Sequence, residues 1–226
     1  VTSVVCSNTL FYKKINPFIK FITVGQYKPT HYDNVYSSRS VIKNDINSHM
    51  KNHFYQSDIW GEANAIIKDA LEPGITIYGE ITGFVGDKFI QKGYDYGSQP
   101  GEFKCWVYRI TETLKDGSVH DFSTNEIIDF CKSKSLNMVP HIYNGEANEF
   151  HPVKGEIGYY GRNLFDELNK QFIGGNCEFC INEVPAEGIV LRVETIPRVW
   201  SAFKLKSFEF RKRESNLVVA EIETEN

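Results

Sequence analysis

The 226-residue sequence has no long apolar run and no regular framework of cysteines. No stretch approaches the length that crosses a membrane, and no charged-then-apolar segment resembles a signal peptide. The five cysteines have scattered spacings, which is typical of a reducing compartment. Cys177 and Cys180 form one C-x-x-C pair without a matching second pair, which disfavours a structural zinc site. We therefore expect a soluble, cytoplasmic protein without a membrane partner.

The sequence also lacks an excess of positive charge, because its formal net charge is -4. Any nucleic acid would therefore be bound by local basic patches rather than by the bulk charge. The clearest such patch consists of Lys204, Lys206 and residues 211–213. For residues 211–213, a solvated strand end is an equally good interpretation.

The pattern of apolar residues predicts more strands than helices. Segments rich in β-branched and aromatic residues predict strands over residues 2–12, 35–42, 75–84, 103–113, 119–122, 187–194 and 200–208. These strands come in runs rather than in strict alternation with helices. The sequence therefore predicts an α+β fold with antiparallel sheets, arranged as a single domain over residues 1–226.

Three helices are expected among these strands. Apolar residues at helical spacing predict the first helix, and they are Ile59, Ala63, Ile66, Ile67 and Ala70. Ser57 is its expected N-cap, and Pro73-Gly74 ends it. Ser123 and Glu126 form a capping box for a second helix through Cys131. A third helix is expected over residues 163–172.

Two motifs near the end of the sequence carry charged residues on strands. Residues 187–192 read E-G-I-V-L-R, and residues 204–206 read K-L-K. Alternate residues of a strand face one side, so Lys204 and Lys206 point the same way. Two like charges side by side are unfavourable unless an anion lies between them. A carboxylate such as Glu187 is the hard ligand that a divalent metal prefers, so the pattern favours phosphate handling.

A third motif, Y-G-E-I-T-G over residues 78–83, precedes these two along the chain. In this order the motifs resemble those of the covalent nucleotidyltransferases, which are polynucleotide ligases and mRNA capping enzymes. Over nearly the whole chain, the sequence is most similar to the RNA ligases of the bacteriophage type. The resemblance implies an ATP-grasp-like nucleotidyltransferase domain that takes AMP from ATP with Mg²⁺ or Mn²⁺. It also implies RNA ends as partners, a role in RNA repair and a monomeric protein.

The same resemblance implies roles for the charged residues. Glu187 would hold the metal, and Lys204 and Lys206 would neutralise the α-phosphate. The family's S-R signature matches Ser38-Arg39, and its Y-G-E motif places a ribose-binding carboxylate at Glu80. Arg39 and Glu80 would therefore bind the sugar.

The aromatic strand over residues 103–109 would supply the ring that stacks on adenine. Tyr108 is the favoured stacking residue, and Trp106 is the alternate because it lies two residues earlier on the same face. The family usually has an aspartate after its stacking aromatic, whereas Arg109 stands there in this sequence. The polar, aromatic loop over residues 91–97 is interpreted either as part of the RNA or nucleotide site or as a tyrosine-rich turn.

The family's nucleophile is a lysine in a K-x-x-G motif, and no lysine precedes Thr2 in such a motif. Because residues 1–5 resemble the segment just after that motif, we expect an N-terminally truncated adenylyltransferase domain that is inactive without its lysine. Only 20 residues follow Lys206, too few for an oligonucleotide-binding barrel. The alternatives are a DNA ligase or capping-type nucleotidyltransferase, or a non-catalytic nucleotide- or RNA-binding module.

Overall fold

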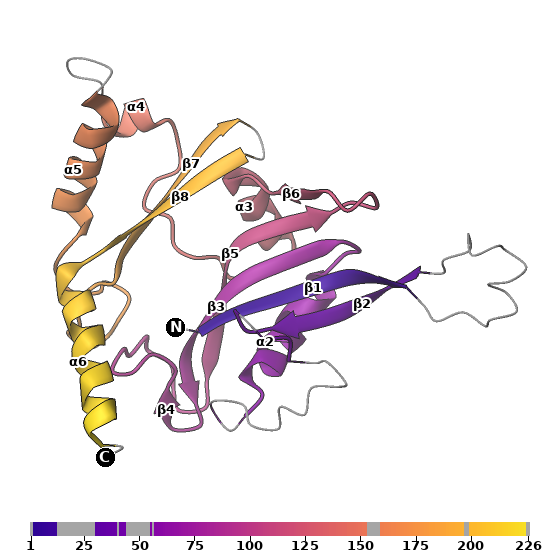
Figure 1. Cartoon of the computed structure of the whole chain (residues 1–226), viewed down its shortest axis with the longest axis horizontal. Helices are drawn as coiled ribbons and strands as arrows, with labels where there is room; N and C mark the ends of the chain where they lie inside the picture. Colours follow the sequence, from indigo (N-terminus) through magenta and orange to yellow (C-terminus); the bar gives the residue numbers. More distant parts are fainter. Residues whose placement is uncertain are drawn as a thin grey trace, which may run out of the picture. The chain divides into compact units, whose positions relative to one another are not determined.

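The computed structural model describes residues 2–12, 30–39, 41–43, 55, 57–152, 159–196 and 199–224 (Figure 1). Side chains are described for all of these except residues 11, 12, 30 and 217–224. The chain divides into two compact units. Unit 1 comprises Val1–Lys92 and Ser98–Val139, and unit 2 comprises Gly93–Gly97 and Pro140–Asn226.

Unit 1 is built on an antiparallel sheet with the strand order β2-β1-β3-β5-β6, and β4 pairs with β3 (Figure 1). The strands are β1 (Thr2–Tyr12), β2 (Thr30–Ser37), β3 (Ile75–Val85), β4 (Lys88–Phe89), β5 (Phe103–Thr113) and β6 (Val119–Asp121). The predictions for β1, β3, β5 and β6 are confirmed to within a residue at each end. The prediction for β2 is wrong in position, since this strand ends at Ser37 and Ile42 forms only an isolated bridge to it.

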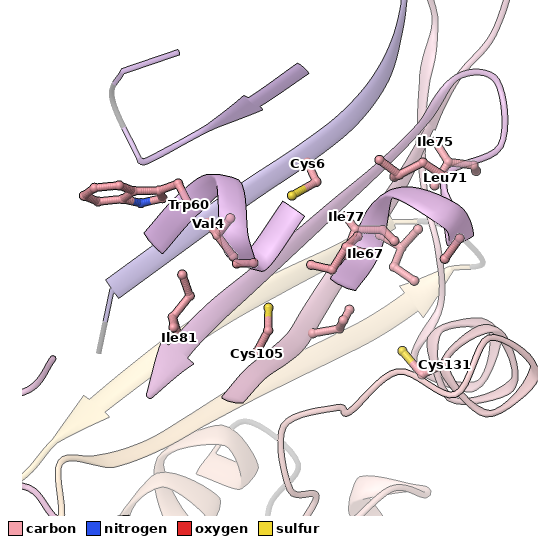
Figure 2. Packing of buried hydrophobic residues seen from close by; sticks show 14 of the residues in the cluster. Val4, Cys6, Trp60, Ile67, Leu71, Ile75, Ile77, Ile81, Cys105 and Cys131 are labelled. Carbon is pink, nitrogen blue, oxygen red and sulfur yellow. The ribbon is translucent and has the colours of Figure 1, made fainter. Parts of the chain in front are cut away.

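One face of this sheet carries the core of unit 1. Helix α2 (Ile59–Ile67), its single 3₁₀ turn (Lys68–Ala70) and helix α3 (Thr124–Ser133) pack on that face. Figure 2 shows side chains from both helices meeting those of β1, β3 and β5. The largest fully buried side chains are isoleucines, namely Ile59, Ile67, Ile77, Ile81 and Ile110. The helices pack on one face, and the opposite face of the central strands carries polar and aromatic residues.

The first turns of α2 and α3 are each fixed by a side-chain cap. Asp58, not the predicted Ser57, caps α2, since its Oδ1 accepts a hydrogen bond from the Gly61 amide at 3.0 Å. The carboxylate of Asp58 accepts two bonds here, because Tyr36 also donates its hydroxyl to Oδ2 at 2.6 Å. The predicted capping box of Ser123 and Glu126 is confirmed.

Unit 2 contains α4 (Ala147–Phe150), α5 (Tyr160–Phe172), the strands β7 (Gly188–Ile196) and β8 (Val199–Lys206), and α6 (Phe208–Thr224). Strands β7 and β8 form an antiparallel pair. Leu164 and Leu168 of α5 pack against Leu205 of β8, with Ile189 and Leu191 beside them. One side of the strand pair is therefore held by the apolar side of α5.

Helix α6 was not expected from the sequence, which predicted a strand to residue 208 and an acidic, frayed tail over residues 221–226. The strand ends at Lys206, and Ser207 begins the helix because its Oγ accepts from the Phe210 amide at 3.1 Å. The described helices include none that combines the length and the apolar character needed to cross a membrane.

Candidate functional site

The register of β7 and β8 determines where the two predicted lysines point. Gly188 pairs with Lys206 and Val190 with Lys204, so both lysines lie on one side of the strand pair. Leu205 points to the other side and is only 8% exposed in the cluster with α5. The expectation that Lys204 and Lys206 share a face while Leu205 packs is therefore met.

Glu187, Lys204 and Lys206 form a cluster that we call the lysine face. The Glu187 Oε1 lies 2.5 Å from the Lys204 Nζ and 3.9 Å from the Lys206 Nζ. Lys206 Nζ also lies 3.1 Å from Oε2 of Glu214 in α6. The side chains of Lys204, Lys206 and Glu187 are 46%, 33% and 26% exposed. Two amines thus share one carboxylate at a place that solvent and an anion can reach.

Gly188 allows this cluster to form. Its φ of +131° lies in the region that favours glycine, and a Cβ there would meet the Leu205 carbonyl oxygen. The same Cβ would lie 3.0 Å from the Cα of Lys206. In a regular strand Glu187 would point to the Leu205 side, and the positive φ at Gly188 interrupts that alternation. The glycine of the E-G motif is therefore a steric requirement, which the sequence did not show.

A second set of predicted residues lies on the face of the unit 1 sheet that is opposite α2 and α3. Alternation along β3 points Ile77, Gly79 and Ile81 into the core and Tyr78 and Glu80 to the opposite face. The side chains on this face of β3 and β5 include Tyr78, Glu80, Thr82, Trp106, Tyr108 and Arg109, and we call these six the aromatic face.

A β-bulge in β5 shapes the aromatic face. Tyr78 pairs with Arg109 and Gly79 pairs with Val107, so Tyr108 is the extra residue between them. Val107 and Ile110 are buried, and the bulge leaves both intervening side chains on the outer side. Tyr108 is 38% exposed, and its ring centroid lies 6.5 Å from that of Tyr78.

Glu80 and Arg39 both interact electrostatically with the Tyr108 phenol. Burial raises the pKa of the Tyr108 phenol, and the Glu80 carboxylate raises it further. Arg109 and Arg39 lower the pKa of the same phenol. Trp106 lies opposite Glu80 in the register, and its indole N–H donates to Thr82 Oγ1 at 2.9 Å. Unit 1 thus places Glu80, Trp106 and Tyr108 on one face of its sheet, and Arg39 interacts electrostatically with Tyr108.

Comparison with known proteins identifies the family of this chain. Residues 8–207 match the profile of the RNA ligase family. The chain belongs to the RNA ligase family. A search of curated proteins found no match. The α+β architecture with an antiparallel sheet is the predicted fold class and fits the nucleotidyltransferase-like fold of RNA ligases.

The loop over residues 91–97 of this RNA ligase family member contributes a core residue to unit 2. Tyr94 is 4% exposed, and its hydroxyl donates to the Pro185 carbonyl at 2.8 Å. Its ring packs edge-on against Phe210 at 6.0 Å, and the Arg213 guanidinium lies over it at 5.3 Å. For Tyr94 the structure favours a packed turn over a residue that lines a ligand site.

Cys177 and Cys180 are free thiols beside this core, and both pack against the cluster around Tyr94. Burial and a hydrogen bond with Cys177 raise the pKa of Cys180 to about 12. A thiol with so high a pKa is a poor nucleophile at neutral pH. Among the residues that the structure describes, no three His, Cys, Asp or Glu side chains gather to hold a metal ion.

Proposed function

We propose that this chain is the adenylyltransferase domain of an ATP-dependent RNA ligase of the bacteriophage type, and that both units belong to it. The reaction has three steps. A lysine takes AMP from ATP, the AMP moves to an RNA 5′-phosphate, and an RNA 3′-hydroxyl displaces AMP to seal the strand. The observation that carries this proposal is the cluster of Lys204 and Lys206 around Glu187.

The lysine face suits the phosphate part of this reaction. Nucleotidyl transfer builds negative charge on the α-phosphate oxygens, so cations already in place lower the barrier. Lys204 and Lys206 supply two such cations on one side of a strand pair. Their present partners are carboxylates that are themselves partly exposed. A phosphate can therefore replace a carboxylate as the partner of either amine without burying a charge.

The donor set also fits a divalent metal. Mg²⁺ and Mn²⁺ accept oxygen ligands, and Mg²⁺ is commonly held by one or two carboxylates together with substrate phosphates and water. Glu187 offers such a carboxylate beside the two lysines, with a quarter of its side chain exposed. Glu187 would hold the metal directly or through water. When bound, the ion supplies positive charge to the phosphate oxygens.

The aromatic face suits the nucleoside. Glu80 and Arg39 are proposed to bind the ribose hydroxyls, since a carboxylate accepts and a guanidinium donates hydrogen bonds. Tyr108 is proposed to stack on adenine because this residue is more than one-third exposed on the outer face. Trp106 is the alternate, and its hydrogen bond to Thr82 holds its ring beside Glu80.

The first step needs a nucleophile, and no lysine of this sequence stands in a K-x-x-G motif. The test therefore requires a form of the protein that is extended upstream with that motif, and we call it the lysine-restored form. It is given equal amounts of 5′-phosphorylated RNA and DNA nicks of identical sequence at a stated salt concentration. We expect the RNA nicks to be sealed preferentially.

The alternative functions predict other results. A DNA ligase would seal nicks with DNA on both sides in preference. A capping-type enzyme would accept GTP and transfer GMP. A non-catalytic RNA- or nucleotide-binding module would bind the strands and seal neither. Each of these results would contradict the proposed function.

A further inference from the structure

Arg109 lies at the centre of a network that links three strands of unit 1. Its Nε and Nη2 donate to the two carboxylate oxygens of Asp121 in β6, at 2.6 and 3.0 Å. Its guanidinium carbon lies 4.8 Å from the ring centroid of Tyr78 in β3. A planar, bidentate Arg–carboxylate pair that also stacks on a ring has one preferred geometry. The network therefore fixes the position of Tyr78 relative to β5 and β6.

Tyr78 in turn contacts Tyr108, the extra residue of the β-bulge. The rings of Tyr78 and Tyr108 are tilted by 48°, with their centroids 6.5 Å apart, which is within the range of favourable aromatic pairs. Tyr108 has no partner residue in the register with β3, because the bulge makes it the extra residue. Its orientation thus depends on side-chain neighbours more than that of a regularly paired strand residue.

The charge of Arg109 is already matched where it stands. Asp121 neutralises the guanidinium, and the two side chains are only 31% and 18% exposed. An arginine in this state is a weak candidate for direct phosphate binding, since that would require breaking a two-bond pair. The Arg109 guanidinium instead contacts the Tyr78 ring, and the Tyr78 ring contacts the Tyr108 ring.

We propose that Arg109 is a positioning residue for nucleotide binding. Paired with Asp121 and stacked on Tyr78, it holds the Tyr108 ring in the orientation that stacks on adenine. This inference rests on the proposed function, because it assigns Tyr108 to the adenine base. It extends that proposal by giving roles to Arg109, Asp121 and Tyr78.

The test measures binding of AMP to the chain by isothermal titration calorimetry. Arg109→Met keeps much of the side-chain volume and removes both the ion pair and the cation–π contact. We expect the Kd for AMP to rise about threefold to tenfold, in line with the usual strength of a partly buried cation–π contact. Asp121→Asn should raise the Kd in the same direction. Inorganic tripolyphosphate, which lacks a base, should bind wild type and variant equally.

Lys134→Met is the matched control within unit 1. Lys134 also combines a carboxylate partner, Glu72 at 2.8 Å, with a ring, Phe130 at 5.8 Å, but it lies at the end of α3. Its removal should leave the Kd for AMP unchanged. If Arg109→Met does not fold, Arg109→Lys carries the same test, because lysine keeps the charge and loses the bidentate geometry.

A double-mutant cycle with Tyr108→Ala separates positioning from a general structural role. If Arg109 acts through the Tyr108 ring, Arg109→Met should cause no further loss of AMP binding once that ring is gone. Additive losses, or an unchanged Kd in Arg109→Met alone, would overturn the inference and leave the proposed function standing. Failure of the wild-type chain to bind either AMP or ATP would overturn both.

Discussion

The two candidate faces differ in how the fold holds them. The aromatic face lies on β3 and β5 in the middle of a sheet, and the other side of those strands is packed with fully buried isoleucines. The lysine face lies on a two-stranded pair, and its three side chains are between one-quarter and one-half exposed. The aromatic face is held by core packing and a β-bulge. The lysine face is held by Gly188 and by ion pairs whose partners can be exchanged.

This difference matches the chemistry proposed for each face. A stacking ring works best when it is already oriented, because ordering it during binding costs free energy. A phosphate-binding amine works best when its present partner can be replaced. Partly exposed ion pairs contribute little to stability, so the lysine face can be changed with little loss of folding. The following predictions separate the two faces by stability and by activity.

The largest effect is expected from the lysine face. In the lysine-restored form, Lys204→Ala, Lys206→Ala and Glu187→Ala should each lower self-adenylylation by more than about tenfold, since a charge-assisted contact contributes about 1.5–3 kcal/mol. Their melting temperatures should stay close to that of the unchanged form. Lys134→Ala, which removes an ion pair elsewhere, is the control. If any of the three variants self-adenylylates as well as the unchanged form, the motif assignment is wrong.

Gly188→Ala should damage stability where the lysine substitutions do not. The new Cβ meets the Leu205 carbonyl and adopts a φ of +131°, so we expect a loss of about 1–3 kcal/mol in the free energy of unfolding. Gly174→Ala is the matched control, because Gly174 has a φ of +136° with no atom within 4 Å of its Cβ position. Urea unfolding of both variants measures the difference. Equal losses would mean that backbone strain, and not the clash with Leu205, decides the requirement at Gly188.

Tyr108→Ala should weaken AMP binding by about tenfold, because stacking of a base on an aromatic side chain contributes about 1–3 kcal/mol. Trp106→Ala removes the alternate ring together with its hydrogen bond to Thr82, and it should have the smaller effect. Calorimetric titration of both variants decides which ring stacks. The reverse order would assign stacking to Trp106.

The last prediction concerns pH and the buried core of unit 1, away from both faces. Burial raises the pKa of Cys6 and of Cys105 from 9.0 to about 12. Above pH 9 the unfolded chain loses these thiol protons while the folded chain keeps them, so stability falls as the pH rises from 9 towards 12. Urea unfolding at about pH 8 and about pH 10.5 measures this loss. Cys6→Ala should reduce the difference between the two pH values, and an unchanged difference would contradict the assignment.

The sequence allowed the central strands to be predicted because alternation and turn residues are local signals. Strand β5 was predicted with its observed ends, and the lysines were predicted to share a face. Helix α6 was missed because Phe208 and Phe210 continue the pattern of the preceding strand, and the cap that begins the helix is one serine, Ser207.

The arrangement of the aromatic face depended on information that the sequence does not hold. The bulge at Tyr108 is defined by pairing with β3, and the partner of Arg109 comes from β6. These contacts join residues on different strands, so no local pattern in residues 103–109 reveals them. The sequence drew attention to Arg109 only because that residue departs from the family's usual pattern.

Covalent labelling of the lysine-restored form with ATP that carries radioactive phosphorus at the α-position tests whether these residues serve nucleotidyl transfer. In the presence of magnesium, the protein should acquire an acid-labile adenylate, and adding 5′-phosphorylated RNA should discharge it to the RNA. The 226-residue chain itself should acquire no label. A folded lysine-restored form that binds ATP and stays unlabelled would contradict the claim that these residues serve nucleotidyl transfer.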